Sequence, residues 1–444
     1  MRESAQAAHS TVPRRNEQRP QPGSVGDLQS TPNVMLVGLP TILASGTISL
    51  TATVYAMMLV AVASLWMKRS STSWFDIGLP CLLLPIASLS IVLRPNYPNT
   101  AIHVVLFILA CVVIGRVVYL SASTSDALIS LIDGIGVFLA TSLLLWLAGF
   151  GGPHDRTSGL DNSLTGGERI VFPLSNSLAA TPAMAAVYVA AVIPILLSYR
   201  QYRNIRLVGV ICAIAIFVLT DSRISLIGAL LASAAVLLIP RIFRGAAPWI
   251  SGALLLIPFI YGVIQSGLGR IVSAASTYSP WLARLGEDAY TLNRRDYIWS
   301  QSLAFYWERV GWISQTVGHG SYGQTESGAS SYYSANLTGL GRDDRLLTPH
   351  NSLLQILFDG GWVTLGAIGA TIVLMAVTLS RRNSPVDLSA LAMLVTLLIV
   401  GSTEVALSPG HAQPTWWILV ALGFIVFARK RTQSAPVCAA TPRS

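Results

Sequence analysis

The sequence predicts an all-α polytopic membrane protein with about twelve transmembrane helices. A large, partly helical extracytoplasmic loop is expected between the ninth and tenth spans. Of the 444 residues, 52% are hydrophobic and only 11% are charged, and the mean hydropathy is +0.59. Apolar runs long enough to cross a bilayer recur along the chain, and short basic clusters lie at their ends. These observations exclude a soluble globular protein. They also exclude a nucleic-acid partner, because the net charge of +9 is divided among these clusters.

The apolar stretch 34–67 is too long for one span. A single helix of that length would measure ~50 Å, whereas the hydrocarbon core is ~30 Å thick, so we expect a division near Leu50. The other expected spans are 74–93, 99–120, 127–149, 177–199, 205–220, 224–240, 248–266, 352–379, 388–407 and 414–428. The resulting organisation is a disordered tail (1–33), nine spans (34–266), an extracytoplasmic catalytic loop (267–350), three spans (351–428) and a second tail (429–444).

The basic clusters predict the orientation. With twelve spans, the arginines and lysines of the short loops fall on one side, together with those of both tails; they lie at 68–69, 200–206, 241–244, 381–382 and 429–431. Short loops rich in Lys and Arg face the cytoplasm. We therefore expect a multi-pass protein of the cytoplasmic (inner) membrane, with both termini inside and the loop 267–350 outside.

The cysteines do not suggest a disulfide framework or a zinc site. Cys81, Cys111 and Cys212 lie within apolar runs, and Cys438 lies in the tail. No ligand spacing typical of a metal site is visible, so we expect neither a metal nor another cofactor.

Thr348-Pro349-His350-Asn351-Ser352 closes the long loop and opens a hydrophobic segment. We expect Thr348 to cap a helix, Pro349 to occupy its first position and His350 to lie in its first turn. The positive helix end would then keep His350 neutral and able to accept a proton. The alternative is an interfacial polar residue without a catalytic role. A Gly-Gly pair at 360–361 predicts a break that turns this helix away from the following span.

Arginines near the outer ends of helices are candidate anion ligands. Asn293 is expected to cap a helix that starts at Arg294-Arg295, where two positive charges oppose the helix dipole. Either a bound anion or the acidic residues at 287, 288 and 296 would relieve this repulsion. Arg223 follows an expected outer turn at Asp221-Ser222, so it either extends to the headgroups or faces a polar cavity.

Other parts of the loop support a folded unit with one flexible region. On the helix from 294, Trp299, Leu303, Tyr306 and Val310 share one face, which is expected to pack on the membrane domain or at the lipid surface. The Gly- and Ser-rich stretch 318–341 is expected to be flexible. Its tyrosines at 322, 332 and 333 are candidates for stacking on sugar rings.

Three short motifs resemble those of the O-antigen ligase family and its polysaccharide-polymerase relatives. The first is His350-Asn351 followed by Gly361 and Thr364. The second is Arg295, Ile298-Trp299 and then Gly318-His319-Gly320. The third is the Asp221-Ser222-Arg223 sequence between two apolar runs. The motifs cover the C-terminal half of the chain, and the N-terminal half is similar to the family only in hydropathy.

The resemblance implies transfer of a glycan from an undecaprenyl diphosphate carrier to an acceptor hydroxyl at the outer membrane face. It implies that His350 is the catalytic base and that Arg223, Arg295 and Arg294 bind the diphosphate. Asn351 would orient the acceptor or bond the backbone. Arginine charge makes a metal unnecessary for this chemistry. His319 and Glu404 are additional candidates, because Glu404 lies near the outer end of its expected span.

The family includes ligases, whose acceptor is lipid A–core, and polymerases, whose acceptor is another lipid-linked repeat unit. We favour a polymerase slightly. The expected partners are the lipid-linked donor, a glycan or lipid-linked acceptor and membrane lipids; other polysaccharide assembly proteins are further candidates. The alternative of another class is a transporter or flippase of lipid-linked glycans. The external position of the longest loop and the scarcity of charges within the spans argue against it.

Overall fold

The computed structural model describes residues 33–66, 79–96, 101–151, 157–162, 165–175, 177–276, 295–334, 347–411 and 413–428. These residues belong to one unit, Pro32–Ser444. The rest of the two predicted tails lies outside the described residues, and so does the candidate phosphate ligand Arg294.

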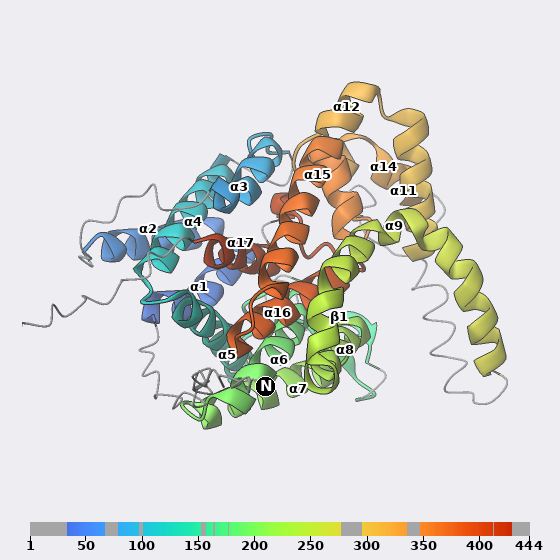
Figure 1. Cartoon of the computed structure of the whole chain (residues 1–444). Helices are drawn as coiled ribbons and strands as arrows, with labels where there is room; N and C mark the ends of the chain where they lie inside the picture. The colour runs from blue at the N-terminus through green and yellow to red at the C-terminus, as the bar shows by residue number, and fades with distance from the viewer. Residues whose placement is uncertain are drawn as a thin grey trace, which may run out of the picture. The chain divides into compact units, whose positions relative to one another are not determined.

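Every expected span corresponds to an apolar helix (Figure 1). These helices are α1 (Val34–Ala44), α2 (Leu50–Trp66), α3 (Leu79–Val92), α4 (Ala101–Leu120), α5 (Thr124–Leu147), α6 (Ala180–Ser198), α7 (Arg203–Thr220), α8 (Arg223–Leu238), α9 (Pro240–Ser276), α15 (Ser352–Ser380), α16 (Pro385–Gly401) and α17 (Pro414–Phe427). The predicted division at Leu50 is confirmed, because α1 ends at Ala44, a short 3-10 turn follows and α2 begins at Leu50.

Six helices among the described residues are long and apolar enough to span a membrane: α4, α5, α6, α7, the Pro240–Ile260 part of α9, and α15. The other six apolar helices are shorter, at 10–17 residues. The chain is therefore a multi-pass α-helical membrane protein. The number of crossings, expected from the sequence to be about twelve, stays a prediction.

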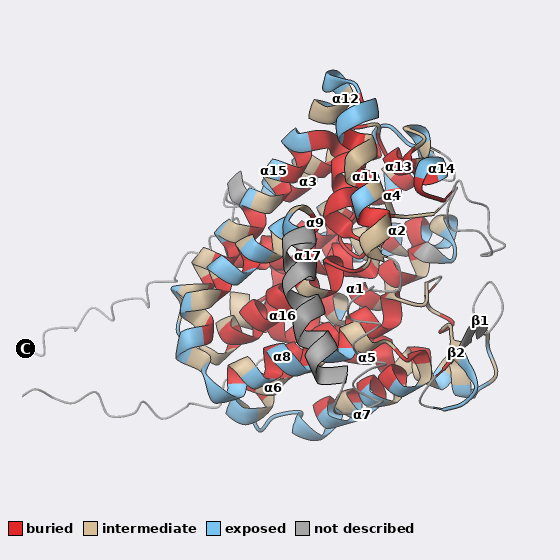
Figure 2. Cartoon of the chain, turned by 90° about the vertical axis from the view of Figure 1, so that its right-hand side faces the viewer, coloured by how far each residue is buried: buried red, intermediate tan, exposed pale blue. Residues whose placement is uncertain are grey.

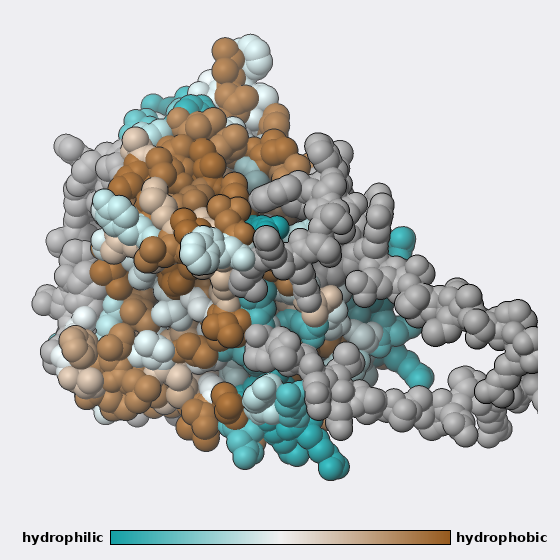
Figure 3. Space-filling view, turned by 90° about the vertical axis from the view of Figure 1, so that its left-hand side faces the viewer, coloured by the Kyte–Doolittle hydropathy of each residue, from teal (hydrophilic) through white to brown (hydrophobic). Residues whose placement is uncertain are grey.

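Burial places α6 and α16 at the centre of the bundle. Of the most apolar window of α6, 78% is buried inside the protein, against 22% for α9. A helix that is apolar on all sides and enclosed by other helices is a core helix. Helix α6 packs on α5, α7, α8 and α16, and buried residues fill this interior in Figure 2. Outward-facing apolar side chains form much of the surface in Figure 3, as expected for contact with lipid.

The described part of the segment between α9 and α15 contains four further helices, α11 (Arg295–Arg309), α12 (Trp312–Val317), α13 (Gly323–Glu326) and α14 (Ala329–Ser334). The predicted packing face of α11 is confirmed, since Trp299, Tyr306 and Val310 are buried and Leu303 packs partly buried against the core.

The expectation that 318–341 is flexible is wrong for residues 318–334, which form two short helices. Tyr333 is fully buried, and its hydroxyl donates to the Leu347 carbonyl. Tyr322 stacks on His411. Among the three tyrosines proposed for sugar stacking, only Tyr332 is exposed, at 36%. The composition suggested a loop, but these aromatic contacts order the segment.

A short hairpin contacts the C-terminal end of α7. Strands β1 (Thr157–Asp161) and β2 (Glu168–Ile170) pair in antiparallel orientation. In the turn between them, the Asn162 side chain donates to the carbonyls of Val218 and Leu219. The hairpin thereby satisfies carbonyls that the helix end would leave unpaired.

Candidate functional site

The residue His350 lies one position before the cap of α15, not in its first turn as predicted. Asn351 is the N-cap, and its Oδ1 accepts hydrogen bonds from the N–H groups of Leu353 and Leu354 at 2.9 and 3.1 Å. The backbone of His350 is left-handed, with φ of 47°. A non-glycine residue in this conformation costs about 1–3 kcal/mol and is typical of functional sites. In this conformation the backbone at His350 does not continue the direction of α15.

The side chain of Asn351 is fully buried and engaged with backbone groups. Besides capping α15, its Nδ2 donates to the Ser402 carbonyl at 2.7 Å. Of the two roles expected for Asn351, these contacts support the second, in which its side chain bonds the backbone. The side chain thereby positions His350, the residue before it.

Ser352 fastens the segment that follows α16 to the start of α15. Its hydroxyl donates to the Glu404 carbonyl at 2.7 Å and accepts from the N–H groups of Ala406 and Leu407 at 3.0 and 2.9 Å. Together with the Asn351–Ser402 bond, this contact fixes where Glu404 lies.

Glu404 joins two of the predicted site residues. Its Oε1 accepts from Nη2 of Arg295 at 2.5 Å, and its Oε2 lies 3.4 Å from Nδ1 of His350. The side chains are 22%, 18% and 35% exposed for Glu404, Arg295 and His350. Burial alone would raise the pKa of Glu404, but the Arg295 guanidinium and the His350 imidazole outweigh it and lower this pKa. Glu404 is therefore a carboxylate at neutral pH.

Arg223 belongs to a second charged group, centred on Asp221. Its Nε lies 3.5 Å from Oδ1 of Asp221, and Nη2 of Arg169 lies 3.4 Å from Oδ2. Asp221 is 1% exposed, whereas Arg223 and Arg169 are 41% and 26% exposed. One buried carboxylate thus lies behind two partly exposed guanidinium groups. Their excess positive charge is what an anion site requires.

Helix α8, which begins at Arg223 of this second group, packs on α16, and the segment with Glu404 follows α16. Gly228, five residues into α8, faces Ile399, two residues before the end of α16; a Cβ added at Gly228 would lie 3.1 Å from the Ile399 side chain. Helix α8, which Arg223 begins, therefore contacts α16 close to the residues that precede the Glu404 segment.

His319 lies apart from His350. Its backbone N–H donates to the Phe358 carbonyl at 2.8 Å, eight residues along α15 from His350, or ~12 Å of helix. Burial, followed by the charge of Arg94, lowers the pKa of His319. Its Nε2 is buried without a hydrogen-bond partner among the described residues. These contacts make His319 part of the packing at the kink of α15.

A buried polar network surrounds Asp359, just before that kink. Oδ1 of Asp359 accepts from the Gly323 N–H and from the Gln355 side chain, both at 2.7 Å. Its Oδ2 accepts from the Ser408 hydroxyl at 2.9 Å, and Ser408 lies 3.3 Å from Nδ1 of His411. Asp359 therefore joins α13, α15 and the segment after α16.

Residues 208–369 match the family model described as O-antigen ligase. This match supports the resemblance to the O-antigen ligase family that the sequence motifs predict. The matched O-antigen ligase region contains Arg223, Arg295 and His350, and it ends before Glu404. No curated protein matches the chain.

Two charged residues of the site were missed in the sequence. Arg169 lies before the O-antigen ligase region, and only the hairpin brings it to Asp221. Asp221 was seen as a turn residue, not as the partner of two arginines. The order of acidic and basic residues along the chain gives no signal for this long-range pairing. Among the described residues, no group of three His, Cys, Asp or Glu side chains is placed to hold a metal ion.

Proposed function

We propose that the protein transfers a glycan from a polyprenyl diphosphate carrier, such as undecaprenyl diphosphate, to a sugar hydroxyl at the outer face of the cytoplasmic membrane. It would act as a polysaccharide polymerase or an O-antigen ligase. The observation that carries the proposal is the Arg295–Glu404–His350 group at the start of α15. The O-antigen ligase match supports the reaction class.

His350 would act as the general base. When Nδ1 donates to Glu404, Nε2 is the atom that accepts a proton. The carboxylate also stabilises the imidazolium that forms, and it orients the ring. Because His350 is 35% exposed, an acceptor hydroxyl can reach it.

The proposed transfer requires no oxidant or reductant. The acceptor oxygen bonds to the anomeric carbon while the bond from that carbon to the diphosphate oxygen breaks. The electron pair leaves with the diphosphate, and the acceptor proton passes to His350. Negative charge that develops on the leaving group requires cations nearby.

Arg295, Arg223 and Arg169 would meet the diphosphate. A guanidinium carries five N–H donors, so Arg295 can bond Glu404 through Nη2 and still address phosphate oxygens. Arginine suits this task because its planar fork binds phosphate in a bidentate manner. The fixed carboxylates of Glu404 and Asp221 hold the guanidinium groups in place before the donor arrives.

The test compares purified His350→Gln and His350→Ala with the unchanged protein, using a lipid-linked glycan donor in detergent. We expect the transfer rate to fall by at least about 10²-fold, as for loss of a general base. The affinity for the donor should change little, because a base acts mainly in the transition state. His319→Gln is the control and should retain the rate.

Two outcomes would contradict this proposal. A His350 variant that keeps more than about a tenth of the rate cannot have lost a general base. A protein that moves lipid-linked glycan across sealed vesicles but transfers none in detergent would be a transporter. Supplying lipid A–core or a second lipid-linked repeat as acceptor then distinguishes a ligase from a polymerase.

A further inference from the structure

An apolar face continues from a membrane span onto the outer helices. After its kink, α15 exposes Val363 and Leu374, at 61% and 41%. These residues are eleven positions apart and lie on one side of the helix. Helix α12 packs on α15 and exposes Trp312 (75%), Ile313 (60%) and Val317 (42%). The six residues of α12 include no charged side chain.

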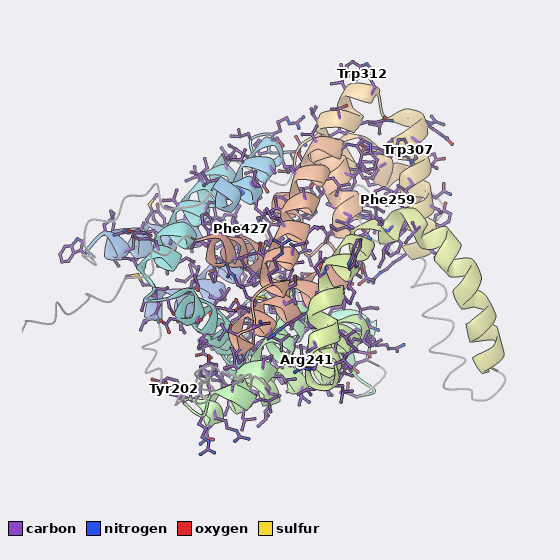
Figure 4. All side chains as sticks on the ribbon, in the orientation of Figure 1. Tyr202, Arg241, Phe259, Trp307, Trp312 and Phe427 are labelled. Atoms are coloured by element: carbon purple, nitrogen blue, oxygen red, sulfur yellow. The ribbon has the colours of Figure 1, made fainter. Side chains whose placement is uncertain are left out.

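Aromatic contacts fix the level of this face relative to the spans. Phe259 lies within α9, which continues to Ser276, and Trp362 is the first residue after the Gly361 kink, where the part of α15 that runs to Ser380 begins. Their ring centroids are 5.6 Å apart, and Trp307 of α11 lies 5.8 Å from Trp362. Phe259, Trp307 and Trp312 lie at the same end of the molecule in Figure 4. Trp362 and the rings packed around it therefore lie at the level where the part of α15 after the kink begins.

We propose that this surface contacts the outer leaflet of the bilayer, at the headgroups and the upper acyl chains. We call it the interfacial face, and it consists of Trp307, Trp312, Ile313, Val317, Trp362 and Val363. Tryptophan is enriched at this depth because its ring is apolar and its N–H is polar. A contiguous apolar surface of this kind marks an interaction site, and its continuity with the exposed side of α15 selects lipid as the occupant.

The contact has a consequence for the site that rests on the proposed function. Arg295 begins α11, and Trp307 lies twelve residues later, at ~18 Å along the helix. A lipid contact at one end of α11 therefore limits the height and tilt of the end that carries Arg295. It would hold this cation near the depth at which a lipid-linked diphosphate lies.

The test is the depth of a fluorescent label at residue 313. The full chain, with its four cysteines replaced by alanine, receives Ile313→Cys and a nitrobenzoxadiazole label, and is placed in phosphatidylethanolamine–phosphatidylglycerol vesicles. Glu308→Cys is the matched control, because Glu308 is also exposed and lies next to Trp307. We expect lipid bearing a doxyl group at carbon 5 to quench the label at 313 severalfold more than the label at 308. Aqueous iodide should show the opposite preference.

Three results would overturn the proposal. Equal iodide quenching at 313 and 308 would place the face in water. Insensitivity of the 313 label to both quenchers would mean that protein covers it, as in a dimer of this chain. Iodide quenching that soluble glycan relieves would make it a sugar-binding surface. Trp312→Cys repeats the measurement at a second exposed position. Because no outcome depends on catalysis, failure here is distinct from failure of the proposed reaction.

Discussion

Gly318 lies against the backbone of Asp359, next to the kink at Gly361, and Gly361 lies against the backbone of Thr316. Neither glycine therefore has room for a side chain. A Cβ at Gly318 would lie 2.3 Å from the Asp359 carbonyl oxygen, and one at Gly361 would lie 2.3 Å from the Thr316 carbonyl oxygen. Both residues have positive φ, 69° and 65°. The end of α12 thus fits into the kink of α15, which explains why both glycines occur in the motifs that resemble the family.

Replacing either glycine with alanine should destabilise the kink. Their backbone conformation, with positive φ and ψ of −171°, is essentially restricted to glycine and costs about 1–3 kcal/mol for a residue with a Cβ, and the backbone clash adds to this cost. We expect Gly318→Ala and Gly361→Ala to lower the thermal unfolding midpoint of the purified protein clearly. Gly366→Ala is the control, because no atom lies within 4 Å of its added Cβ. Equal midpoints for Gly361→Ala and Gly366→Ala would show that the close approach is unimportant.

The ion pair of Glu404 should make stability depend on pH in the acidic range. Since the pKa of Glu404 is lowered in the folded state, its stabilising contribution is complete above its ordinary pKa of about 4.3. That contribution is lost as the pH falls through the lowered value. Glu404→Gln removes the charge and keeps the shape, so the difference in thermal midpoint from the unchanged protein should shrink on acidification.

The measurement is a series of thermal midpoints from about pH 7 to about pH 3. Glu308→Gln, at an exposed position on α11, controls for the loss of one acidic residue. A difference between Glu404→Gln and the unchanged protein that stays constant over this range would show that Glu404 is not held as a carboxylate by its partners.

The predicted orientation can be tested with single cysteines. Ser331 on the outer segment and Asn204 at the start of α7 are both exposed. With the positive-inside arrangement, a membrane-impermeant thiol reagent should label Ser331→Cys in intact spheroplasts and reach Asn204→Cys only after lysis. The reverse pattern would invert the topology and place the candidate site on the cytoplasmic side.

The helices could be predicted because apolar length and composition alone specify them. The twelve apolar helices lie where hydropathy placed the spans, and the packing face of α11 follows from its periodicity. The Gly361 kink was also predictable, since paired glycines interrupt a helix. The cap of α15 was not, because both Thr348 and Asn351 are good capping residues. The hydrogen bond from the Trp299 indole to the Pro349 carbonyl, at 2.9 Å, is a long-range contact that holds the backbone before Asn351.

The sequence named His350, Arg295, Arg223 and Glu404 as candidates, but it gave no signal for Arg169 or for which residues each charge contacts. Ser352, 52 positions away, holds the backbone of Glu404, and Arg169 of β2 pairs with Asp221 at the end of α7. Such pairings depend on tertiary packing, which periodicity does not encode. His319 was proposed because it lies between Gly318 and Gly320. Gly318, however, allows the close contact between the end of α12 and the kink of α15.

The pair Arg169 and Arg223 should contribute to donor binding through their shared contact with Asp221. We expect Arg169→Ala and Arg223→Ala each to weaken the affinity for a polyprenyl diphosphate by about 10-fold or more, since hydrogen bonds to charged groups contribute about 1.5–3 kcal/mol. Arg223→Lys should weaken it too, because an ammonium lacks the bidentate fork. Asp221→Asn keeps a residue that tolerates the left-handed backbone but releases both guanidinium groups, so it should also reduce affinity.

Arg309→Ala is the matched control for these variants. Arg309 is an exposed arginine of α11 that lies over the Tyr332 ring, so its loss changes the net charge equally without touching Asp221. Affinity would be measured by binding of the diphosphate to purified protein in detergent at two salt concentrations. If Arg169→Ala and Arg223→Ala bind the donor as Arg309→Ala does, then the Asp221 group only stabilises the turn between α7 and α8. In that case the diphosphate would have to bind through Arg295 and Arg294, the other two arginines that the sequence assigns to it.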